Sequence, residues 1–277
     1  MFCSVERVAQ LMDDIAPIKW AEEWDNVGLL LGYRGAKVER LMVVLDISPA
    51  VVEEAVKKNV DMIIAHHPLI FSPLKRIVDD SLVGRLILPL ASHNIAVYCA
   101  HTNLDMTMGG VDDTLARLLG LNKINYLNLD DAKQSSKPGV GRWGKLESPI
   151  PLMDFIKLVG KALNIPSLDV IKSTGTRDDK KIHTVALCAG SGADYMTHAK
   201  KIGADIFVTG EIKYHDALTA HWLGIDVLAA GHFYTELPIV KELISRLQMI
   251  MDSLQYKVEI IESEMQMSPY SRIFIEE

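Results

Sequence analysis

Val60-Asp61-Met62-Ile63-Ile64-Ala65-His66-His67-Pro68 is the stretch that decides how this chain folds. Its first six residues form a short, β-branched, apolar run of the kind found in buried strands. Pro68 favours an extended backbone at His67, and adjacent side chains on extended backbone point to opposite sides. Strand packing gives no reason for two histidines at this point. The pair therefore suggests two neighbouring metal ions rather than one chelated ion.

The residues before this stretch predict a strand over 41–47 and a helix over 49–58. Strand, helix and strand of this length form a βαβ unit, which favours a parallel sheet with helices on its faces. Ligands of such sheets bind beyond the carboxyl ends of the strands, where His66 and His67 fall. The same strand–helix rhythm continues to the end of the chain, with further strands predicted over 94–100, 182–188, 205–211, 226–231 and 256–261. The pattern predicts an α/β fold.

Two more of these strands end in a histidine with an acid four residues later. They give His101-Thr102-Asn103-Leu104-Asp105 and His232-Phe233-Tyr234-Thr235-Glu236. Any one of these histidines alone would more often be a packed or hydrogen-bonded residue. Three such motifs at one edge of one sheet favour a site for Zn, Fe, Mn or similar ions, because imidazole and carboxylate suit these metals. Few protein ligands shared between two ions leave room for water, as catalysis requires.

Composition narrows the possible functions. The chain has 277 residues, 49% hydrophobic and 23% charged, which is typical of a globular protein. A net charge of −7 argues against a nucleic-acid or membrane surface. No apolar run reaches the roughly 18 residues of a membrane span, and no signal peptide is visible at the start. The three cysteines, Cys3, Cys99 and Cys188, form no disulfide framework. We therefore expect a cytoplasmic protein.

Three local features allow two interpretations each. Trp20 and Trp24 either cover the core or, together with Asp25, form the wall of a pocket. The turn at residues 190–192 either holds an anion on free backbone N–H groups or is simply a tight strand-to-helix turn. His215 either is exposed or lines the cavity of the metal site.

Several motifs together resemble the Nif-three-like family, also described as GTP cyclohydrolase 1 type 2 homologues. They are Glu23-Trp24-Asp25-Asn26-Val27-Gly28, Ala65-His66-His67-Pro68-Leu69-Ile70-Phe71, Ala100-His101-Thr102-Asn103-Leu104-Asp105, Gly110-Val111-Asp112-Asp113, Gly141-Arg142-Trp143-Gly144, Thr209-Gly210-Glu211 with Tyr214-His215, and Gly231-His232-Phe233-Tyr234-Thr235-Glu236. The likeness spans nearly the whole chain. Some members of the family carry an extra domain inserted mid-chain. Here only the polar junction at 129–140 occupies that region, so the chain resembles the short form.

The resemblance implies a two-lobed α/β fold with mixed or parallel sheets flanked by helices, and a metal site between the lobes at strand ends. We place the first lobe at residues 1–128 with 232–277, and the second at 129–231. The family assembles as a toroidal hexamer. The resemblance also implies a dinuclear metal centre, with Glu236 bridging the ions, held by His66, His67, Asp105, His232 and Glu236. His101 falls beside this centre as an acid/base residue.

The resemblance leaves two functions open. The first is a metal-dependent hydrolase acting on a nucleotide or related small molecule, with Glu236 and His101 as catalytic residues. A nucleotide needs an anion site, for which Arg142, Lys145, Lys213 and the turn at 190–192 are the candidates. The second is a metal-binding scaffold that engages a protein partner without catalysis.

Overall fold

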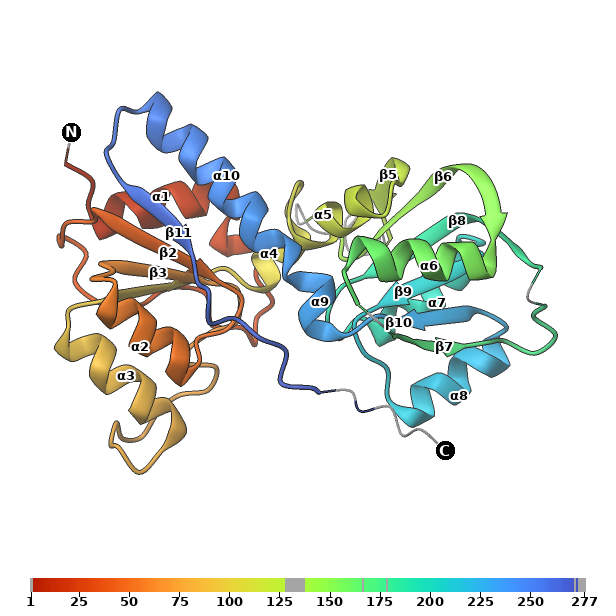
Figure 1. Cartoon of the computed structure of the whole chain (residues 1–277), viewed down its shortest axis with the longest axis horizontal. Helices are drawn as coiled ribbons and strands as arrows, with labels where there is room; N and C mark the ends of the chain where they lie inside the picture. Colours follow the sequence, from red (N-terminus) through yellow and green to blue (C-terminus); the bar gives the residue numbers. More distant parts are fainter. Residues whose placement is uncertain (1, 128–137, 166, 178, 272, 274–277) are drawn as a thin grey trace.

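Figure 1 shows a computed structural model in which two α/β lobes lie side by side, each with a central sheet covered by helices. The structure describes residues 2–127, 138–165, 167–177, 179–271 and 273. Most of the predicted polar junction at 129–140 lies outside these residues. None of the helices in the described part of the chain has the length and apolar character that a bilayer crossing needs.

The first lobe is built on a five-stranded sheet in the order β1-β4-β3-β2-β11. Four of its strands run parallel, and β1 is antiparallel to β4. Their bounds are β1 Gly28–Leu31, β2 Arg40–Val44, β3 Met62–Ala65, β4 Ala96–Cys99 and β11 Glu259–Glu262. Every residue of β3 and β4 is buried, which is why these segments read as continuous apolar runs rather than as alternating ones.

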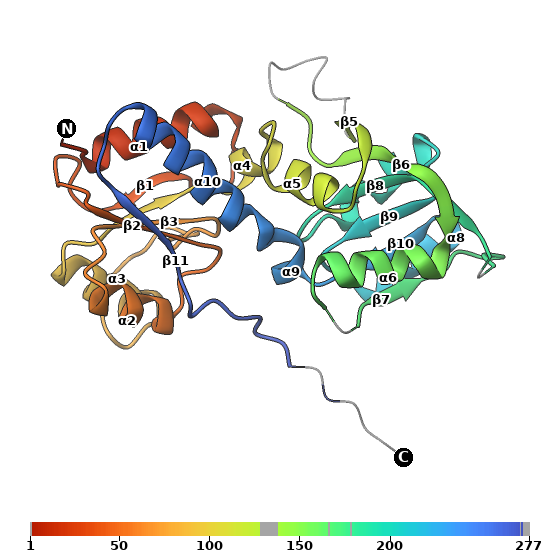
Figure 2. The same cartoon turned by 45° about the horizontal axis from the view of Figure 1, so that its top comes forward.

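Helices cover both faces of this sheet (Figure 2). Helices α1 (Val5–Ile15) and α10 (Pro238–Ser253) pack on one face, and α2 (Pro49–Lys57) and α3 (Leu82–Ser92) on the other. Helix α1 begins after Ser4, whose side chain accepts a hydrogen bond from the backbone N–H of Arg7 and so caps the helix. The helices thereby bury both faces of the sheet. The carboxyl ends of its strands are left uncovered and can carry a binding site.

The second lobe has a six-stranded mixed sheet in the order β5-β6-β8-β9-β10-β7. Strands β8, β9 and β10 are parallel, and the others are antiparallel to their neighbours. Helices α5 and α6 contribute to the core on one face, and α7 and α8 to the core on the other. The bounds are β5 Asn122–Tyr126, β6 Arg142–Pro151, β7 Asp169–Ile171, β8 Lys181–Cys188, β9 Ile206–Thr209, β10 Asp226–Ala229, α5 Val111–Leu118, α6 Leu152–Ala162, α7 Met196–Lys201 and α8 Tyr214–Leu223.

The predicted α/β class, with mixed sheets flanked by helices, is confirmed. The residues after β4 and β10 form one-turn helices, α4 (Thr102–Met106) and α9 (His232–Glu236). The predicted boundary at residues 128 and 129 stays a prediction; β5, which precedes it, pairs with β6 of the second sheet. The chain returns from the second lobe through α9 and α10, and β11 then pairs with β2.

Candidate metal centre

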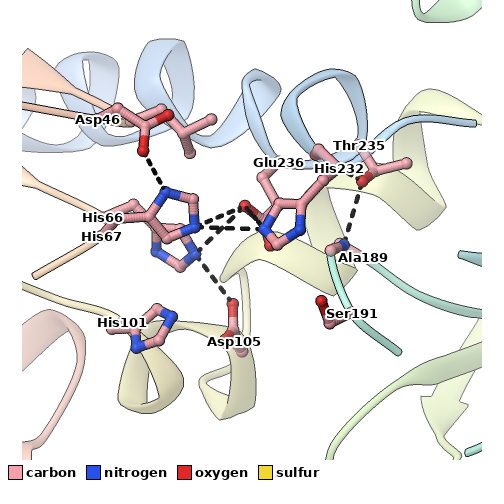
Figure 3. A network of polar contacts seen from close by, with 12 residues as sticks. Asp46, His66, His67, His101, Asp105, Ala189, Ser191, His232, Thr235 and Glu236 are labelled. Atoms are coloured by element: carbon pink, nitrogen blue, oxygen red, sulfur yellow. Dashed lines mark hydrogen bonds and ion pairs between the residues drawn. The ribbon is translucent and has the colours of Figure 1, made fainter. Parts of the chain in front are cut away.

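Six polar side chains predicted from the sequence meet between the two lobes, and Figure 3 shows them turned toward one another. Three strands deliver them, because each motif begins within three residues of the end of its strand. The first sheet supplies His66 and His67 after β3, and His101 and Asp105 after β4; the second sheet supplies His232 and Glu236 after β10. Our expectation that all three motifs share the edge of one sheet is therefore wrong: β10 belongs to the other sheet.

The one-turn helices explain the four-residue spacing of two of the motifs. Residues four apart on a helix lie on the same face, so His232 and Glu236 project together from α9, and Asp105 of α4 lies one turn after His101, the N-cap of that helix. In α9, Nε2 of His232 lies 3.0 Å from Oε2 of Glu236. The same carboxylate oxygen lies 3.1 Å from Nε2 of His67, which comes from the other lobe.

Two groups in this cluster could hold a metal ion. His66, His67 and His101 form one, and His67, His232 and Glu236 form the other; in each, the ligand atoms lie within 4.8 Å of one another. His67 belongs to both, and its Nε2 lies 3.4 Å from Nε2 of His232. Asp105 lies beside the first group, with Oδ1 at 3.6 Å from Nε2 of His66. The six predicted side chains thus form one continuous cluster.

In the first motif, both imidazoles are fixed through Nδ1. The Nδ1–H of His66 donates to the carbonyl oxygen of Ala100 at 2.9 Å. Nδ1 of His67 lies 2.7 Å from Oδ1 of Asp46. Such partners fix the tautomer and the ring orientation, as they do for metal-binding histidines generally. Nε2 of each ring is left to face the centre.

The other two imidazoles are held in the same way, by carboxylates. Nδ1 of His101 lies 2.9 Å from Oδ1 of Asp25, whose other oxygen accepts a hydrogen bond from the backbone N–H of Thr102 at 3.0 Å. Nδ1 of His232 lies 3.5 Å from Oε1 of Glu211. All four rings therefore present Nε2 to the same space.

Two buried atoms at the centre lack a hydrogen-bond partner among the described residues. They are Nε2 of His66 and Oε2 of Glu236; the contacts of this oxygen with Nε2 of His67 and of His232, at 3.1 and 3.0 Å, do not have hydrogen-bond geometry. Leaving a buried polar atom without a partner costs about 1–3 kcal/mol, and native structures rarely accept that cost without a reason. A divalent cation would satisfy both atoms, because one is an imidazole lone pair and the other a carboxylate oxygen. The residues present therefore fit a metal ion.

The protonation states agree with this chemistry for His66, because burial lowers its pKa to about 3 and keeps the ring neutral. Burial also lowers the pKa of His67, but contacts with Asp46 and Glu236 outweigh that effect and raise it to about 10. Burial and the charge of Glu236 raise the pKa of Asp105 well above its ordinary value. In the metal-free protein this cluster holds protons that a cation would displace.

The backbone of the second lobe comes unusually close to the centre at Gly190. A Cβ built on this residue would collide with Oε1 of Glu236 and lie 3.1 Å from Nε2 of His232, and its φ of +58° favours glycine. The N–H of Gly190 donates to Oγ1 of Thr235 at 3.1 Å, which ties the turn to α9. We did not predict this role for Gly190 from the sequence.

Asp46 and Glu211 are two further residues that we missed, and strand register could have found them. Val44 of β2 pairs with Ala65 of β3 in parallel register, so Asp46 follows its strand at the same distance as His67. Thr209 of β9 pairs in the same way with Ala229 of β10, so Glu211 lies next to the start of α9. Each carboxylate comes from the strand beside the one that carries its histidine.

The centre opens onto two cavities. The larger, of 630 Å³, is lined by His67, His101, His232 and Glu236 together with Trp24, Phe71 and other residues of both lobes. The smaller, of 450 Å³, lies on the other side of His67 and His232. His215 is exposed and lines neither cavity.

The predicted anion site is not present as expected. Arg142 is 1% exposed and paired with Asp113, with both Nε–Oδ1 and Nη2–Oδ2 distances at 3.0 Å. Lys145 and Lys213 line neither cavity. In the turn at 190–192, the N–H groups of Gly190 and Gly192 each donate to a threonine hydroxyl at 3.1 Å. The buried arginine and this turn thus serve the fold.

The chain matches the family described as Duf34/NIF3 (NGG1p interacting factor 3) over residues 3–269. It is 36% identical to the "GTP cyclohydrolase 1 type 2 homolog" of Clostridium acetobutylicum over 98% of this chain and 99% of that one. The protein of the same name from Bacillus subtilis is 27% identical over 370 aligned positions, covering 96% of this chain and 98% of its own, so it carries residues that this shorter chain lacks.

A solved structure, "The Crystal Structure of Bacillus cereus protein related to NIF3", superposes with a TM-score of 0.90 at 25% identity, covering 98% of this chain and 99% of that one. The family predicted from the motifs is thus confirmed in both sequence and fold. The chain belongs to the Duf34/NIF3 family.

Proposed function

We propose that this protein is a metal-dependent hydrolase that uses two divalent ions, of the Zn, Fe or Mn type, at the candidate metal centre. One observation carries the proposal: four imidazoles are fixed through Nδ1 and turn Nε2 toward two carboxylates. Curated relatives carry the name "GTP cyclohydrolase 1 type 2 homolog", which supports a hydrolytic reaction on a small molecule.

The proposed ligands are those that the sequence predicts: His66, His67, Asp105, His232 and Glu236. Glu236 is the residue best placed to serve both ions. Its Oε2 lies 3.0 Å from Nε2 of His232 and 3.9 Å from Nε2 of His66. Bound divalent ions supply Lewis acidity, which lowers the pKa of a coordinated water and yields a nucleophile near neutral pH.

His101 is the proposed proton carrier. Hydrogen bonds from His101 and Thr102 outweigh the effect of burial and lower the pKa of Asp25 to about 2, so this carboxylate is ionised and holds Nδ1–H of the ring. Nε2 is then free to accept a proton from water at the cavity and to return it to a leaving group.

The proposal is tested by metal content and turnover in the same preparations. Wild-type protein should retain metal through purification, and Glu236→Gln should lose most of it together with activity toward any substrate found in a metabolite screen. Glu242→Gln is the matched control, because Glu242 lies on α10 with a surface ion pair to Arg117 at 3.5 Å. A Glu236→Gln protein with full metal content and full turnover would overturn the proposal.

His101→Asn separates proton transfer from metal binding. We expect full metal content with turnover reduced about 10²–10⁴-fold, the usual contribution of a general acid or base. Loss of one equivalent of metal would instead make His101 a ligand.

Two further parts of the proposal concern the cellular localisation of the protein and its oligomeric state. We propose a cytoplasmic protein, supported by three buried free cysteines, Cys3, Cys99 and Cys188. The hexamer, and the alternative role as a scaffold for a protein partner, stay predictions. Partner capture that survives Glu236→Gln in the absence of any turnover would favour the scaffold.

A further inference from the structure

Two exposed aromatic side chains stand at the mouth of the larger cavity. Trp24 is 59% exposed and Phe71 is 54% exposed, and their ring centroids lie 5.9 Å apart with the planes tilted by 50°. Trp24 also meets His101 edge to face, with centroids 6.2 Å apart. Core packing gives no reason for this exposure. Of the two interpretations of Trp24, the structure supports the pocket wall.

Basic side chains are missing from this space. Within the described parts of the chain, neither cavity at the metal centre is lined by a lysine or an arginine. Both cavities are lined by acidic side chains in addition to the carboxylates of the metal centre. Glu22 and Asp194 line the larger cavity, and Asp169 lines the smaller one. A phosphorylated ligand would enter against the field of these groups.

The proposed metal ions would not reverse this balance. Five carboxylates contact the histidine cluster: Asp25, Asp46, Asp105, Glu211 and Glu236. When all five are ionised, their charge offsets the four positive charges of two divalent ions and weakens the attraction for an anion.

Three backbone N–H groups next to the larger cavity are also unavailable to an anion. The N–H groups of Gly190 and Gly192 already donate to threonine hydroxyls, and that of Ala189 donates to Oδ1 of Asp112 at 2.8 Å. A phosphate needs such donors to be free. These three donors are thus committed to the fold.

We propose that the larger cavity takes an uncharged planar heterocycle of the nucleobase or nucleoside class. The ring stacks on Trp24 beside Phe71 and presents its edge to the metal centre, whereas a nucleoside triphosphate is disfavoured. This inference rests on the proposed function and narrows its substrate class. It departs from the nucleotide in the relatives' printed name, because stacking supplies affinity for any π-face without requiring a phosphate site.

The first experiment compares guanosine, GMP and GTP by isothermal titration on metal-loaded protein. We expect guanosine to bind tightest and affinity to fall with each added phosphate. Trp24→Ala should weaken guanosine binding about ten-fold or more, the usual effect of removing a stacking ring. Trp222→Ala should leave it unchanged, since Trp222 is 74% exposed on α8 and lines neither cavity.

The second experiment changes the charge of the cavity wall. Asp194→Lys should raise the affinity for GMP relative to guanosine several-fold, and the gain should shrink in 1 M salt because the Debye length falls to about 3 Å. Glu53→Lys is the matched control, an exposed acid on α2 outside both cavities.

Tighter binding of GTP than of guanosine, or no binding of guanosine, would overturn the inference. Metal content is measured on the same samples without any ligand. This measurement tests the proposed metal centre independently of which ligand binds.

Discussion

Replacing Gly190 with alanine tests whether the second lobe is shaped around the metal centre. Gly190 has a φ of +58°, and an added Cβ would collide with Oε1 of Glu236. The left-handed conformation costs an alanine roughly 1–2 kcal/mol. A chain of this size loses roughly 2–4 °C in Tm per kcal/mol. The clash adds a second effect, because either the turn or the carboxylate must move.

Gly203→Ala isolates the first effect from the second. Gly203 has a φ of +73° but nothing within 4 Å of an added Cβ. Both variants should therefore lose a few degrees in Tm, while only Gly190→Ala should lose metal. A displaced Glu236 should weaken metal binding by at least the 10–100-fold typical for loss of a residue that merely supports a ligand.

The assay is elemental analysis after dialysis of each variant against the same chelator buffer, followed by thermal unfolding of the metal-free forms. Equal Tm losses with metal loss confined to Gly190→Ala would support the reasoning. A Gly190→Ala protein that keeps the wild-type metal content would refute it, because the turn would then accommodate the added Cβ without displacing Glu236. Equal metal loss in Gly203→Ala would refute it as well.

Three further predictions concern the same centre and its support. Asp46→Asn removes the carboxylate that holds Nδ1 of His67 at 2.7 Å, and competition with a chelator dye should show about 10–100-fold weaker metal binding. Metal affinity should rise with pH between 6 and 9, because the pKa of His67 is raised to about 10 in the metal-free protein and its proton must leave; a flat titration would contradict this. Arg142→Met leaves Asp113 without its buried partner and should cost about 3–5 kcal/mol by denaturant unfolding, whereas Lys145→Met, an exposed change on the same strand, should cost little.

Much of the fold followed from the sequence because buried parallel strands leave a strong local signal. Strand β3 is apolar at every position, and its bounds agree with the predicted strand at 60–65 to within two residues. Short edge strands leave a weak signal. Strand β7 has only three residues, and β5 places mostly polar side chains in an edge position of the second sheet. Their partners, rather than their own residues, decide that they are strands.

The residues of the metal centre also differ in how readily the sequence predicts them. His66, His67, His101 and His232 were predictable because imidazole directly after a buried strand has no packing explanation. Their carboxylate partners were harder to recognise, because one acid after a strand resembles an ordinary surface residue. Only the pairing of Val44 with Ala65, which brings Asp46 beside the first histidine motif, reveals the connection. Register is a property of two segments, so one segment read alone does not contain it.

The remaining error, that one sheet would carry every ligand, shows what the centre does for the fold. Two sheets present their strand ends to each other, and the ligands come from both: His67 from the first, and His232 with Glu236 from the second. A bound cation would tie elements that are distant in the chain and would be held only while the lobes are docked. Ligand binding to one state stabilises that state. Because α9 leads directly into α10, which covers the first sheet, metal binding and lobe docking are expected to be a single linked equilibrium.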